Sequence, residues 1–589
     1  MCGIVGFSGD KDADLLSSML ACVAHRGRDE AIQSFPKGMN LGMNRLAVID
    51  LSKHLYPMRY KNYWMIFNGE IYNYRELRHR LSQRGIRFQT TSDAEVILPL
   101  FDLYGVDALS KLEGMFALSI FDEHKNTLLL ARDKAGEKPL YYAQNRYGVF
   151  FASELKSLLA TKRVSRELNT HSLADFFYYG SLESEKTFLA DVQRVRPSGY
   201  IQFDLNRGRK KNGRYWRFPR GSKSVVRTFS ESLEILDALL RVSVQARTRA
   251  DVEIGSFLSG GVDSSLLTYY AKLFHPTLRT FSVSFLDSAW SDESGYSRQV
   301  ASFLGTNHTV VPCAANNLTT VVTHIGRYLD EPVVDPAALP TYLLAQKASQ
   351  HLKVVLSGVG ADELFGGYYR YLLRFLQGTP LRMLRFLQHN SRGLIKHYTA
   401  QKIWNVDELS HLLKIPYRLS ASTLGHRFTN NPTFVRPMMA KDFRHYLGEQ
   451  ILMMQDKITM CHTLELRAPY LDTNIVQFSS QLPNSYLFRG IHGKYILRKL
   501  ASRYLPPRIA WRLKRGFSPP LGRWLREEFR EIVWESIDML KPYQELINLE
   551  YCRTAARMHM SSAGNKGLRD KIWSLIVLAR WLDEYRIVI

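Results

Sequence analysis

The chain has 589 residues, 45% of them hydrophobic, which exceeds what one hydrophobic core usually serves and predicts two or more globular domains. Its five cysteines lack CxxC spacing, which argues against both a disulfide framework and a cysteine zinc site. No signal-peptide pattern opens the sequence, and the longest apolar stretch, residues 573–579, is too short to cross a bilayer. A cytoplasmic protein without a membrane span is expected.

The net charge of +24 and a pI near 9.7 would suit nucleic acid, an anionic membrane surface or an acidic substrate. The basic residues are spread along the chain and are not interleaved with aromatic residues, which favours a solvated basic surface, and no nucleic-acid partner is expected. The densest basic segment lacks apolar periodicity and is interpreted as a hairpin tip and linker. It contains Arg207, Arg209, Lys210, Lys211, Arg214, Arg217 and Arg220.

The first two hundred residues contain short apolar runs that alternate with a period of two and are separated by Gly, Asn and Asp. These runs predict antiparallel strands. They span residues 64–67, 115–121, 127–131 and 148–152. Two stretches with helical periodicity interrupt them, at residues 14–23 and 94–104.

After the basic segment, predicted strands alternate with predicted helices, which is typical of βαβ units and a parallel sheet. The strands span residues 253–258, 279–285, 308–312 and 353–356, and the helices span residues 264–273 and 294–304, with a long helical stretch after residue 312. The last two hundred residues are mostly helical in pattern. We expect domains over residues 1–206 and 228–589, joined by a basic hairpin and linker over residues 207–227.

Cys2 follows Met1 directly, and its small side chain allows the initiator methionine to be removed. The thiol and a free α-amine would then share one residue. Because the pKa of an α-amine is ordinarily well below that of lysine, the amine can act as the base that activates the thiol, as in N-terminal-nucleophile hydrolases. Some chains simply begin Met-Cys, so this pair alone leaves both interpretations open.

Several motifs follow Cys2-Gly3-Ile4 in order. They are His25-Arg26-Gly27, Arg45-Leu46, Asn68-Gly69-Glu70-Ile71-Tyr72-Asn73, Ser92-Asp93-Ala94-Glu95 and Arg132-Asp133. Together they resemble the class II glutamine amidotransferase domain over nearly all of residues 1–205. The resemblance implies an αββα antiparallel sandwich of the Ntn-hydrolase type, in which Cys2 attacks the amide of glutamine.

The same resemblance implies roles for the motif residues. Asn68 and Gly69 would donate to the oxyanion, and Asn68 would also contact glutamine. Arg45 would pair with the α-carboxylate of glutamine, while Glu70 and Asp93 would hold its α-ammonium. Outside this context, Arg45 is compatible with a surface ion pair and Asn68-Gly69 with a tight turn between strands.

One position departs from the family pattern, which usually has proline after His-Arg-Gly. This chain has Arg28 there. The loop near the thiol is therefore expected to be less rigid, with its chemistry intact.

Residues 259–265, Ser-Gly-Gly-Val-Asp-Ser-Ser, follow a predicted strand and open a predicted helix. Small residues let backbone amides approach an anion, and the helix dipole favours one. The loop lacks GxxxxGK[ST], so it is not a Walker loop. It resembles the SGGxDSS loop of ATP pyrophosphatases, with a turn that binds no ligand as the alternative. The ATP-binding residues implied are Leu258, Ser259, Gly260, Gly261, Asp263, Ser264, Ser265, Ser357 and Gly358.

Later motifs resemble the asparagine synthetase domain over residues 228 to 540. They are Asp330-Glu331-Pro332 and the runs 357–368, 464–472 and 494–498. The resemblance implies a doubly wound parallel α/β domain with extra helices, magnesium held by Asp263 and Asp362, and a catalytic Lys494 that neutralises charge on the phosphates. A solvated helix lysine is the alternative for Lys494. Residues 514–517 also fit a family loop, or else a surface turn.

Val359 stands where aspartate-using members of this family usually carry Glu or Asp. Either another base, Glu363 or Asp330, replaces that carboxylate, or the acceptor is not aspartate. Related proteins amidate uronic acids of surface polysaccharides or carboxylates of natural-product pathways.

The resemblance as a whole implies an asparagine synthetase-type amidotransferase that uses glutamine, ATP and Mg²⁺. It would form AMP and pyrophosphate, with aspartate as the default acceptor and an apolar passage for ammonia. A homodimer is a family expectation. The more distant alternatives are a basic RNA-modifying ATP pyrophosphatase and a non-catalytic scaffold associated with polysaccharide or membrane.

Overall fold

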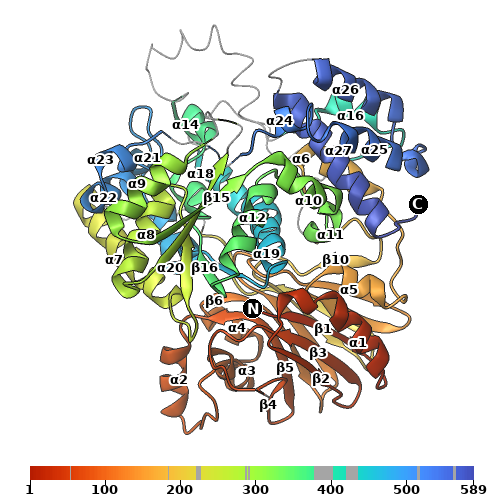
Figure 1. Ribbon diagram of the computed structural model, residues 1–589. Coiled ribbons are helices and arrows are strands. Elements are labelled where there is room, and N and C mark those ends of the chain that lie inside the picture. The colour runs from red at the N-terminus through yellow and green to blue at the C-terminus, as the bar shows by residue number, and fades with distance from the viewer. Residues whose placement is uncertain are drawn as a thin grey trace.

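The computed structural model describes residues 1–53, 55–182, 185–219, 227–285, 288, 292–376, 402–419, 435–513, 516, 518–561 and 566–589. Arg220 of the basic segment and residues 514, 515 and 517 of the possible family loop lie outside these ranges. In Figure 1 the N-terminal domain, with its sheets, lies below a larger C-terminal domain, and the N-terminus lies where the two meet.

Two six-stranded antiparallel sheets form the N-terminal domain, with the strand orders β10-β8-β9-β1-β3-β2 and β12-β11-β7-β6-β5-β4. The first sheet comprises β1 (Gly3–Ser8), β2 (Glu30–Ser34), β3 (Met39–Arg45), β8 (Tyr141–Asn145), β9 (Gly148–Ala152) and β10 (Val192–Arg194). The second comprises β4 (Met58–Tyr60), β5 (Tyr63–Ile71), β6 (Gly114–Asp122), β7 (Thr127–Arg132), β11 (Gly199–Asp204) and β12 (Arg209–Arg214). The basic segment thus contains the edge strand β12, which forms a hairpin with β11.

Helices cover the outer faces of both sheets. Helices α1 (Ala13–Cys22) and α5 (Leu155–Ala160) contact the first sheet, and α3 (Ile97–Tyr104), with the preceding turn η2 (Asp93–Val96) and α2 (Tyr74–Ser82), lies on the side of the second. Apolar side chains fill the space between the sheets, among them Ile4, Met43, Ile66, Leu128 and Phe151. This is the αββα sandwich that the sequence predicts.

The C-terminal domain is built on a parallel sheet with the strand order β15-β14-β13-β16-β17. Its strands are β13 (Ile254–Phe257), β14 (Arg279–Phe285), β15 (Asn307–Cys313), β16 (Val354–Leu356) and β17 (Glu465–Arg467). Helices α7 (Phe229–Arg247), α8 (Val262–Phe274) and α9 (Ser294–Leu304) cover one face, and α12 (Ala338–Ala348) and α19 (Leu452–Met460) cover the other. The sheet is therefore doubly wound, as predicted, and its order reverses between β13 and β16, where ligands of such sheets bind.

Two expectations about helices need correction. The stretch predicted as one helix over residues 94–104 divides into η2 and α3. The long helical stretch after residue 312 divides into η4 (Ala315–Leu318), α10 (Thr319–Thr323), α11 (Ile325–Leu329) and α12. Periodicity predicts the helical character of such stretches but not where a short turn interrupts them.

The remaining helical elements lie mostly in the C-terminal domain. Short turns are η1 (Ala24–Arg26), η3 (Gly105–Asp107), η7 (Pro469–Leu471) and η8 (Lys541–Tyr543). Helices are α4 (Ala108–Lys111), α6 (His171–Tyr179), α13 (Ala361–Phe365), α14 (Tyr369–Leu376), α16 (Val406–Leu412), α18 (Val435–Asp442), the π-helix η6 (Phe443–Ile451), α20 (Thr473–Gln481), α21 (Asn484–Leu487), α22 (Tyr495–Tyr504), α23 (Pro507–Ala510), α24 (Leu521–Trp524), α25 (Arg530–Met539), α26 (Leu549–Ser561) and α27 (Lys566–Glu584).

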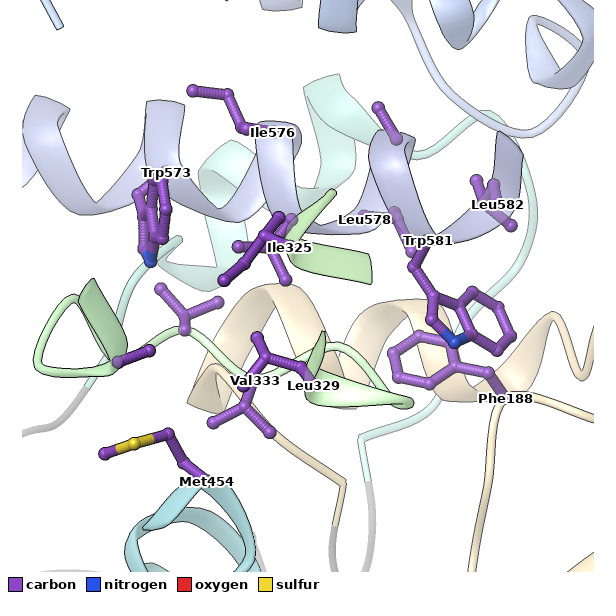
Figure 2. Close-up of a cluster of buried hydrophobic side chains, with 14 of the residues drawn as sticks. Phe188, Ile325, Leu329, Val333, Met454, Trp573, Ile576, Leu578, Trp581 and Leu582 are labelled. Atoms are coloured by element: carbon purple, nitrogen blue, oxygen red, sulfur yellow. The ribbon is translucent and has the colours of Figure 1, made fainter. Parts of the chain in front are cut away.

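Helix α27 carries the longest apolar stretch of the sequence and is a core helix. Figure 2 shows Trp573 of α27 on the side of the helix that faces Ile325 and Leu329 of α11, and Trp581 beside Phe188. Among the residues that the structure describes, no helix is long and apolar enough to cross a membrane.

Candidate active sites

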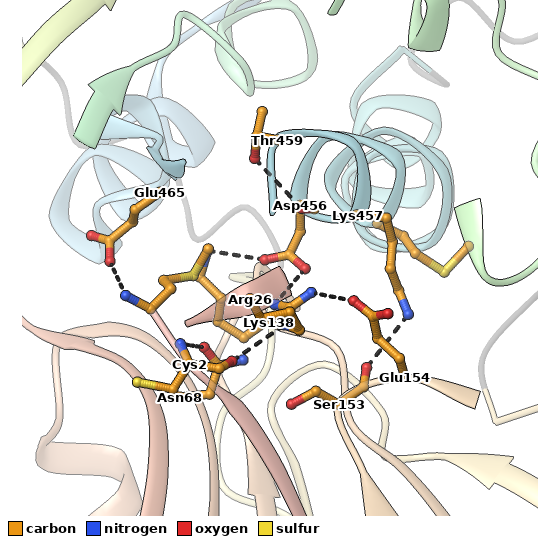
Figure 3. A network of polar contacts seen from close by, with 12 residues as sticks. Cys2, Arg26, Asn68, Lys138, Ser153, Glu154, Asp456, Lys457, Thr459 and Glu465 are labelled. Carbon is orange, nitrogen blue, oxygen red and sulfur yellow. Dashed lines mark hydrogen bonds and ion pairs between the residues drawn. The ribbon is translucent and has the colours of Figure 1, made fainter. Parts of the chain in front are cut away.

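Cys2 lies directly before β1, at the boundary of the two domains. Its peptide nitrogen donates to Asn68 Oδ1 at 2.9 Å, and Arg26 Nε donates to its carbonyl at 3.2 Å (Figure 3). The side chain is 6% exposed, and this burial raises the pKa of the thiol, against the opposing effects of the N-terminal ammonium and Arg45. The thiol therefore keeps its proton and needs a base before it can act as a nucleophile.

Met1 is present in this structure, so the terminal amine belongs to Met1 and not to Cys2. The Met1 ammonium is fully buried and pairs with Glu465 Oε2 of β17 at 2.8 Å. If Met1 were removed, the Cys2 nitrogen would become an amine within reach of Asn68 Oδ1. The structure is compatible with the amine acting as base, which stays a prediction.

Asn68 and Gly69 are consecutive residues of β5. Asn68 is fully buried, and its Nδ2 has no hydrogen-bond partner among the residues that the structure describes, so this donor is available to an oxyanion. Gly69 lies opposite Phe116 of β6, and a Cβ at this position would approach the carbonyl oxygen of Met115 to 2.0 Å. The strand pair therefore tolerates only glycine beside the Asn68 amide.

The three residues expected to bind the amino-acid end of glutamine are all buried near Cys2. Arg45 ends β3, and its guanidinium donates to the carbonyls of Asp50 and Ser52. Burial and the neighbouring Asp93 raise the pKa of Glu70 well above its usual range. Asp93 accepts from the backbone nitrogen of Ile71 at 2.6 Å, and burial raises its pKa to about 6.

A second site lies at the carboxyl end of β13, where the loop of residues 259–261 leads into α8. Gly260 has a φ of +70°, and a Cβ there would lie 2.7 Å from the backbone nitrogen of Ser297. The loop after β16 lies against this one, since a Cβ on Gly358 would lie 3.1 Å from the nitrogen of Ser264. The two loops meet at the switch point of the sheet.

A pocket of about 80 Å³ opens over this loop. Of the nine residues expected to bind ATP, Ser259, Gly261 and Asp263 line it. The other six belong to the same loop, its flanking residues or the adjoining loop after β16. Arg498 and Arg512 also line the pocket. Arg498 belongs to the motif of residues 494–498 without an assigned role, and no sequence pattern indicates Arg512.

Lys494 joins the two carboxylates expected to hold magnesium. Its Nζ lies 2.5 Å from Asp263 Oδ2 and 2.6 Å from Asp362 Oδ1. Gly367 makes room for this contact, because a Cβ there would lie 1.8 Å from Asp362 Oδ1 and 2.1 Å from Lys494 Cε. Lys494 is therefore a buried part of the pocket and not a solvated helix lysine.

The carboxylates of this pocket fit magnesium only in the manner of a nucleotide site. Within the described ranges, no three His, Cys, Asp or Glu side chains form a group that could hold a metal. Magnesium in nucleotide sites usually takes only one or two carboxylates together with phosphate and water. Asp263 Oδ1 is buried and has no hydrogen-bond partner among the described residues, so Asp263 and Asp362 fit that pattern.

The two carboxyl groups that might replace the one missing at Val359 have different surroundings. Glu363 follows Asp362 in α13 and accepts from the Tyr368 hydroxyl at 2.6 Å, and burial, with the repulsion of Asp362, raises its pKa to about 7. Asp330 accepts from Lys457 Nζ at 2.7 Å and from the nitrogen of Leu155 at 2.6 Å. Asp330 is thus held at the boundary of the two domains. Of the two candidates, Glu363 is therefore the one that lies beside the pocket.

A buried charge network at the domain boundary includes residues for which the sequence indicates no role. Arg26 Nη1 lies 2.8 Å from Glu154 and its Nη2 2.8 Å from Asp456 of α19, which also pairs with Lys138 (Figure 3). Arg467 of β17 reaches Glu70 at 3.4 Å. The motifs contain Arg26 and Arg467, but only the fold shows that they connect the Cys2 site to the other domain.

Two family models match the chain: one described as glutamine amidotransferase domain over residues 1–216, and one described as asparagine synthase over residues 235–583. Asparagine synthetase [glutamine-hydrolyzing] 1 of Bacillus subtilis (strain 168) is 32% identical over 624 aligned positions, covering 99% of this chain and 96% of the relative. Asparagine synthetase [glutamine-hydrolyzing] 3 of the same organism is 27% identical and covers 87% of this chain and 86% of its own length.

Proposed function

This chain belongs to the asparagine synthase family, and from that premise we propose that it hydrolyses glutamine at Cys2 and uses the ammonia to amidate a carboxylate that ATP has activated. The observation that carries the second half is Lys494, whose Nζ lies within 2.6 Å of both Asp263 and Asp362 at the loop after β13.

In the glutaminase step, the Cys2 sulfur attacks the glutamine amide carbon, and the Cys2 amine accepts the thiol proton once Met1 has been removed. Asn68 Nδ2 and the Gly69 N–H donate to the oxyanion. Ammonia leaves, and water then releases glutamate. Arg45 pairs with the substrate α-carboxylate. Glu70 and Asp93 hold the α-ammonium, which in turn favours their ionised forms.

In the synthetase step, an acceptor carboxylate attacks the α-phosphorus of ATP and expels pyrophosphate, which leaves an acyl-adenylate. Asp263 and Asp362 would hold magnesium, which supplies positive charge against the phosphates when bound. Lys494 adds a further positive charge where the pyrophosphate develops. Ammonia then attacks the acyl carbon, and AMP leaves.

Ammonia becomes ammonium in bulk water, so its transfer needs a dry route between the sites. One apolar cluster contains side chains of both domains. From the N-terminal domain come Leu46, Val48, Tyr72 and Met115, which remain after Met1 has been removed, and from the C-terminal domain Val354, Leu356 and Ala468. This shared cluster supports a passage along the domain boundary.

Aspartate is the default acceptor, and another carboxylate, such as a uronic acid or a natural-product intermediate, is the alternative. Val359 packs against the shared apolar cluster and supplies no charge near the acyl group. Glu363, with a pKa of about 7, is the neighbouring carboxyl that can accept a proton from the attacking ammonia at neutral pH.

The test is pyrophosphate release from ATP and magnesium, with glutamine present, across aspartate, uronic-acid sugars and other carboxylates, with mass spectrometry of the amide formed. Asparagine as the product would confirm aspartate as the acceptor. Turnover with a different carboxylate and none with aspartate would confirm the alternative. If no carboxylate supports pyrophosphate release, the adenylation step is wrong.

A further inference from the structure

We propose that a basic cleft between the two domains binds a small molecule that carries a phosphate or pyrophosphate group. The cleft is lined by Lys134, Arg196, Arg214 and Arg217 of the N-terminal domain and by Phe443 and Arg444 of η6. It shares no lining residue with the pocket over the loop after β13, and none of the residues assigned to glutamine lines it.

The charge of the basic cleft is only partly compensated by the residues that the structure describes. Five lysine and arginine side chains line it, and among the described lining residues the only carboxylate is Glu449, which pairs with Arg194 at 2.7 Å. Lys134 pairs with Glu113, and Arg196 pairs with Glu185 at 2.7 Å. Arg214 and Arg217 form no ion pair within the described part of the chain, and the nearby Glu185 only partly offsets the positive charge around Arg214.

These positive charges are close enough to act on one another. Partial burial lowers the pKa of Arg214, and the charges of Arg196, Arg444 and Arg217 lower it further. An oxyanion among them would relieve this repulsion. Because a guanidinium presents a planar fork of donors that matches phosphate geometry, several converging arginines select phosphate over smaller, singly charged anions.

The fold holds the two sides of the cleft together. Gly448 of η6 lies against the loop after β7, where a Cβ would be 3.0 Å from the Ala135 carbonyl oxygen. The rings of Phe218 and Phe443, one from each side, have centroids 4.7 Å apart. A ligand that contacts Arg214 and Arg444 would therefore touch both domains at once.

The shape of the cleft favours a small ligand over a nucleic acid. Its volume is about 140 Å³, which suits a phosphorylated group and not a folded chain. Single-stranded RNA is bound by aromatic faces on which bases stack. Here Trp216 packs edge-on against Phe218, which packs against Phe443, so these rings engage one another.

The experiment is calorimetric titration of the full chain with inorganic pyrophosphate, after a non-hydrolysable ATP analogue has filled the pocket over the loop after β13. We expect binding at one further site. The double variant Arg214→Gln with Arg217→Gln should weaken it roughly tenfold or more, which equals about 1.4 kcal/mol. The matched control, Arg207→Gln with Arg209→Gln, removes the same charge from the exposed end of the same hairpin and should bind like the wild type.

Arg444→Gln, on the opposite domain, should also weaken pyrophosphate binding. This variant tests the proposal if the double variant fails to fold. Glutamine hydrolysis reports the folding of each variant. Equal affinity in all variants would overturn the proposal, because the cleft arginines would then play no part in binding. An equal loss in both double variants would also overturn it, because net charge alone would then explain the binding. Binding of tRNA that depends on Arg214 and Arg217, with none of pyrophosphate, would overturn it in favour of a nucleic acid.

Discussion

The protonation of Asp93 should make glutamine binding at the proposed site depend on pH. Burial raises the pKa of its carboxyl from an ordinary value of 3.8 to about 6. The protonated form is therefore favoured in the fold; its contribution to stability is complete below pH 3.8 and is lost as the pH rises through about 6. The ionised carboxylate, the form proposed to bind the ammonium group of glutamine, appears over the same interval.

We expect kcat/KM for glutamine hydrolysis to rise between about pH 5 and pH 7, with a midpoint near 6, since this ratio reports the free enzyme. The measurement is glutamate release as a function of pH. Asp93→Asn should lower kcat/KM at neutral pH and remove this midpoint. A midpoint that persists in the variant would assign the titration to another group.

Substitution of Cys2 tests whether glutamine hydrolysis and amide formation occur at separate sites. Cys2→Ala should lower glutamine hydrolysis by roughly a thousandfold or more, as removal of a nucleophile usually does, while amide formation from added ammonium salt continues. Cys22→Ala, a change to a cysteine of α1 outside the site, is the matched control. Loss of ammonia-dependent synthesis in Cys2→Ala would contradict the model of two separate sites.

Single residues differ in how far the sequence predicts them. Asn68 and Asp93 stand in short motifs, so their chemistry can be read locally, and the structure places both beside Cys2. The partners of Arg26 cannot be read in this way. Asp456 is 430 residues away, and the pair exists only because α19 packs on the N-terminal domain.

At the scale of elements, the turn from β13 into α8 depends on Gly260. Its φ of +70° and its contact with the Ser297 nitrogen leave no space for a side chain. A side chain held in this region costs about 1–3 kcal/mol. Gly260→Ala should therefore raise KM for ATP roughly tenfold or more in pyrophosphate release, while glutamine hydrolysis is retained.

Gly295→Ala is the control for that variant. Gly295 lies in the first turn of α9, and a Cβ there would meet no atom within 4 Å. Its kinetics with ATP should match the wild type. Equal effects of the two substitutions would mean that the shape of the loop does not set nucleotide affinity.

The sequence predicts the longer elements better than the short ones. Strands β9 and β14 and helix α9 begin and end at the predicted residues, because turn residues such as Gly305 separate clear periodic runs. Strand β17 has only three residues and no alternation of its own. Its place in the sheet follows from pairing with β16, which a local pattern cannot show.

At the scale of the whole molecule, the domains are joined by buried charges whose partners come from both sides. Asp456→Ala would leave Arg26 and Lys138 buried without this carboxylate. Loss of one partner from a buried pair usually costs about 3–5 kcal/mol. We expect a lower Tm and more glutamate released per pyrophosphate, because the two sites would no longer be held in register.

Calorimetry and paired product assays measure both effects. Asp538→Ala removes a carboxylate of the exposed pair with Arg553, and its loss should leave the Tm close to the wild-type value, because solvent screens exposed ion pairs. If Asp456→Ala keeps the wild-type Tm and the wild-type ratio of products, the network neither stabilises nor couples the domains.

Lys494 Nζ pairs with both Asp263 and Asp362 and so offsets one of their two negative charges. Magnesium alone would have to displace this lysine from the two carboxylates. When magnesium arrives with ATP, the lysine can pair with the phosphates instead. We expect magnesium alone to change Tm little and magnesium with ATP to raise Tm. At a ligand concentration of one hundred times Kd, the free energy of unfolding should rise by about 2.7 kcal/mol. A large shift with magnesium alone would contradict this.

The same contact sets an order of arrival. Because a lysine already pairs with both carboxylates, the site offers a free cation less negative charge, and we expect metal and nucleotide to enter as one complex. The rate at subsaturating nucleotide should then follow the concentration of the magnesium–nucleotide complex and not that of the free ion. Activity in the cell would accordingly vary with the supply of ATP and change little with the concentration of free magnesium.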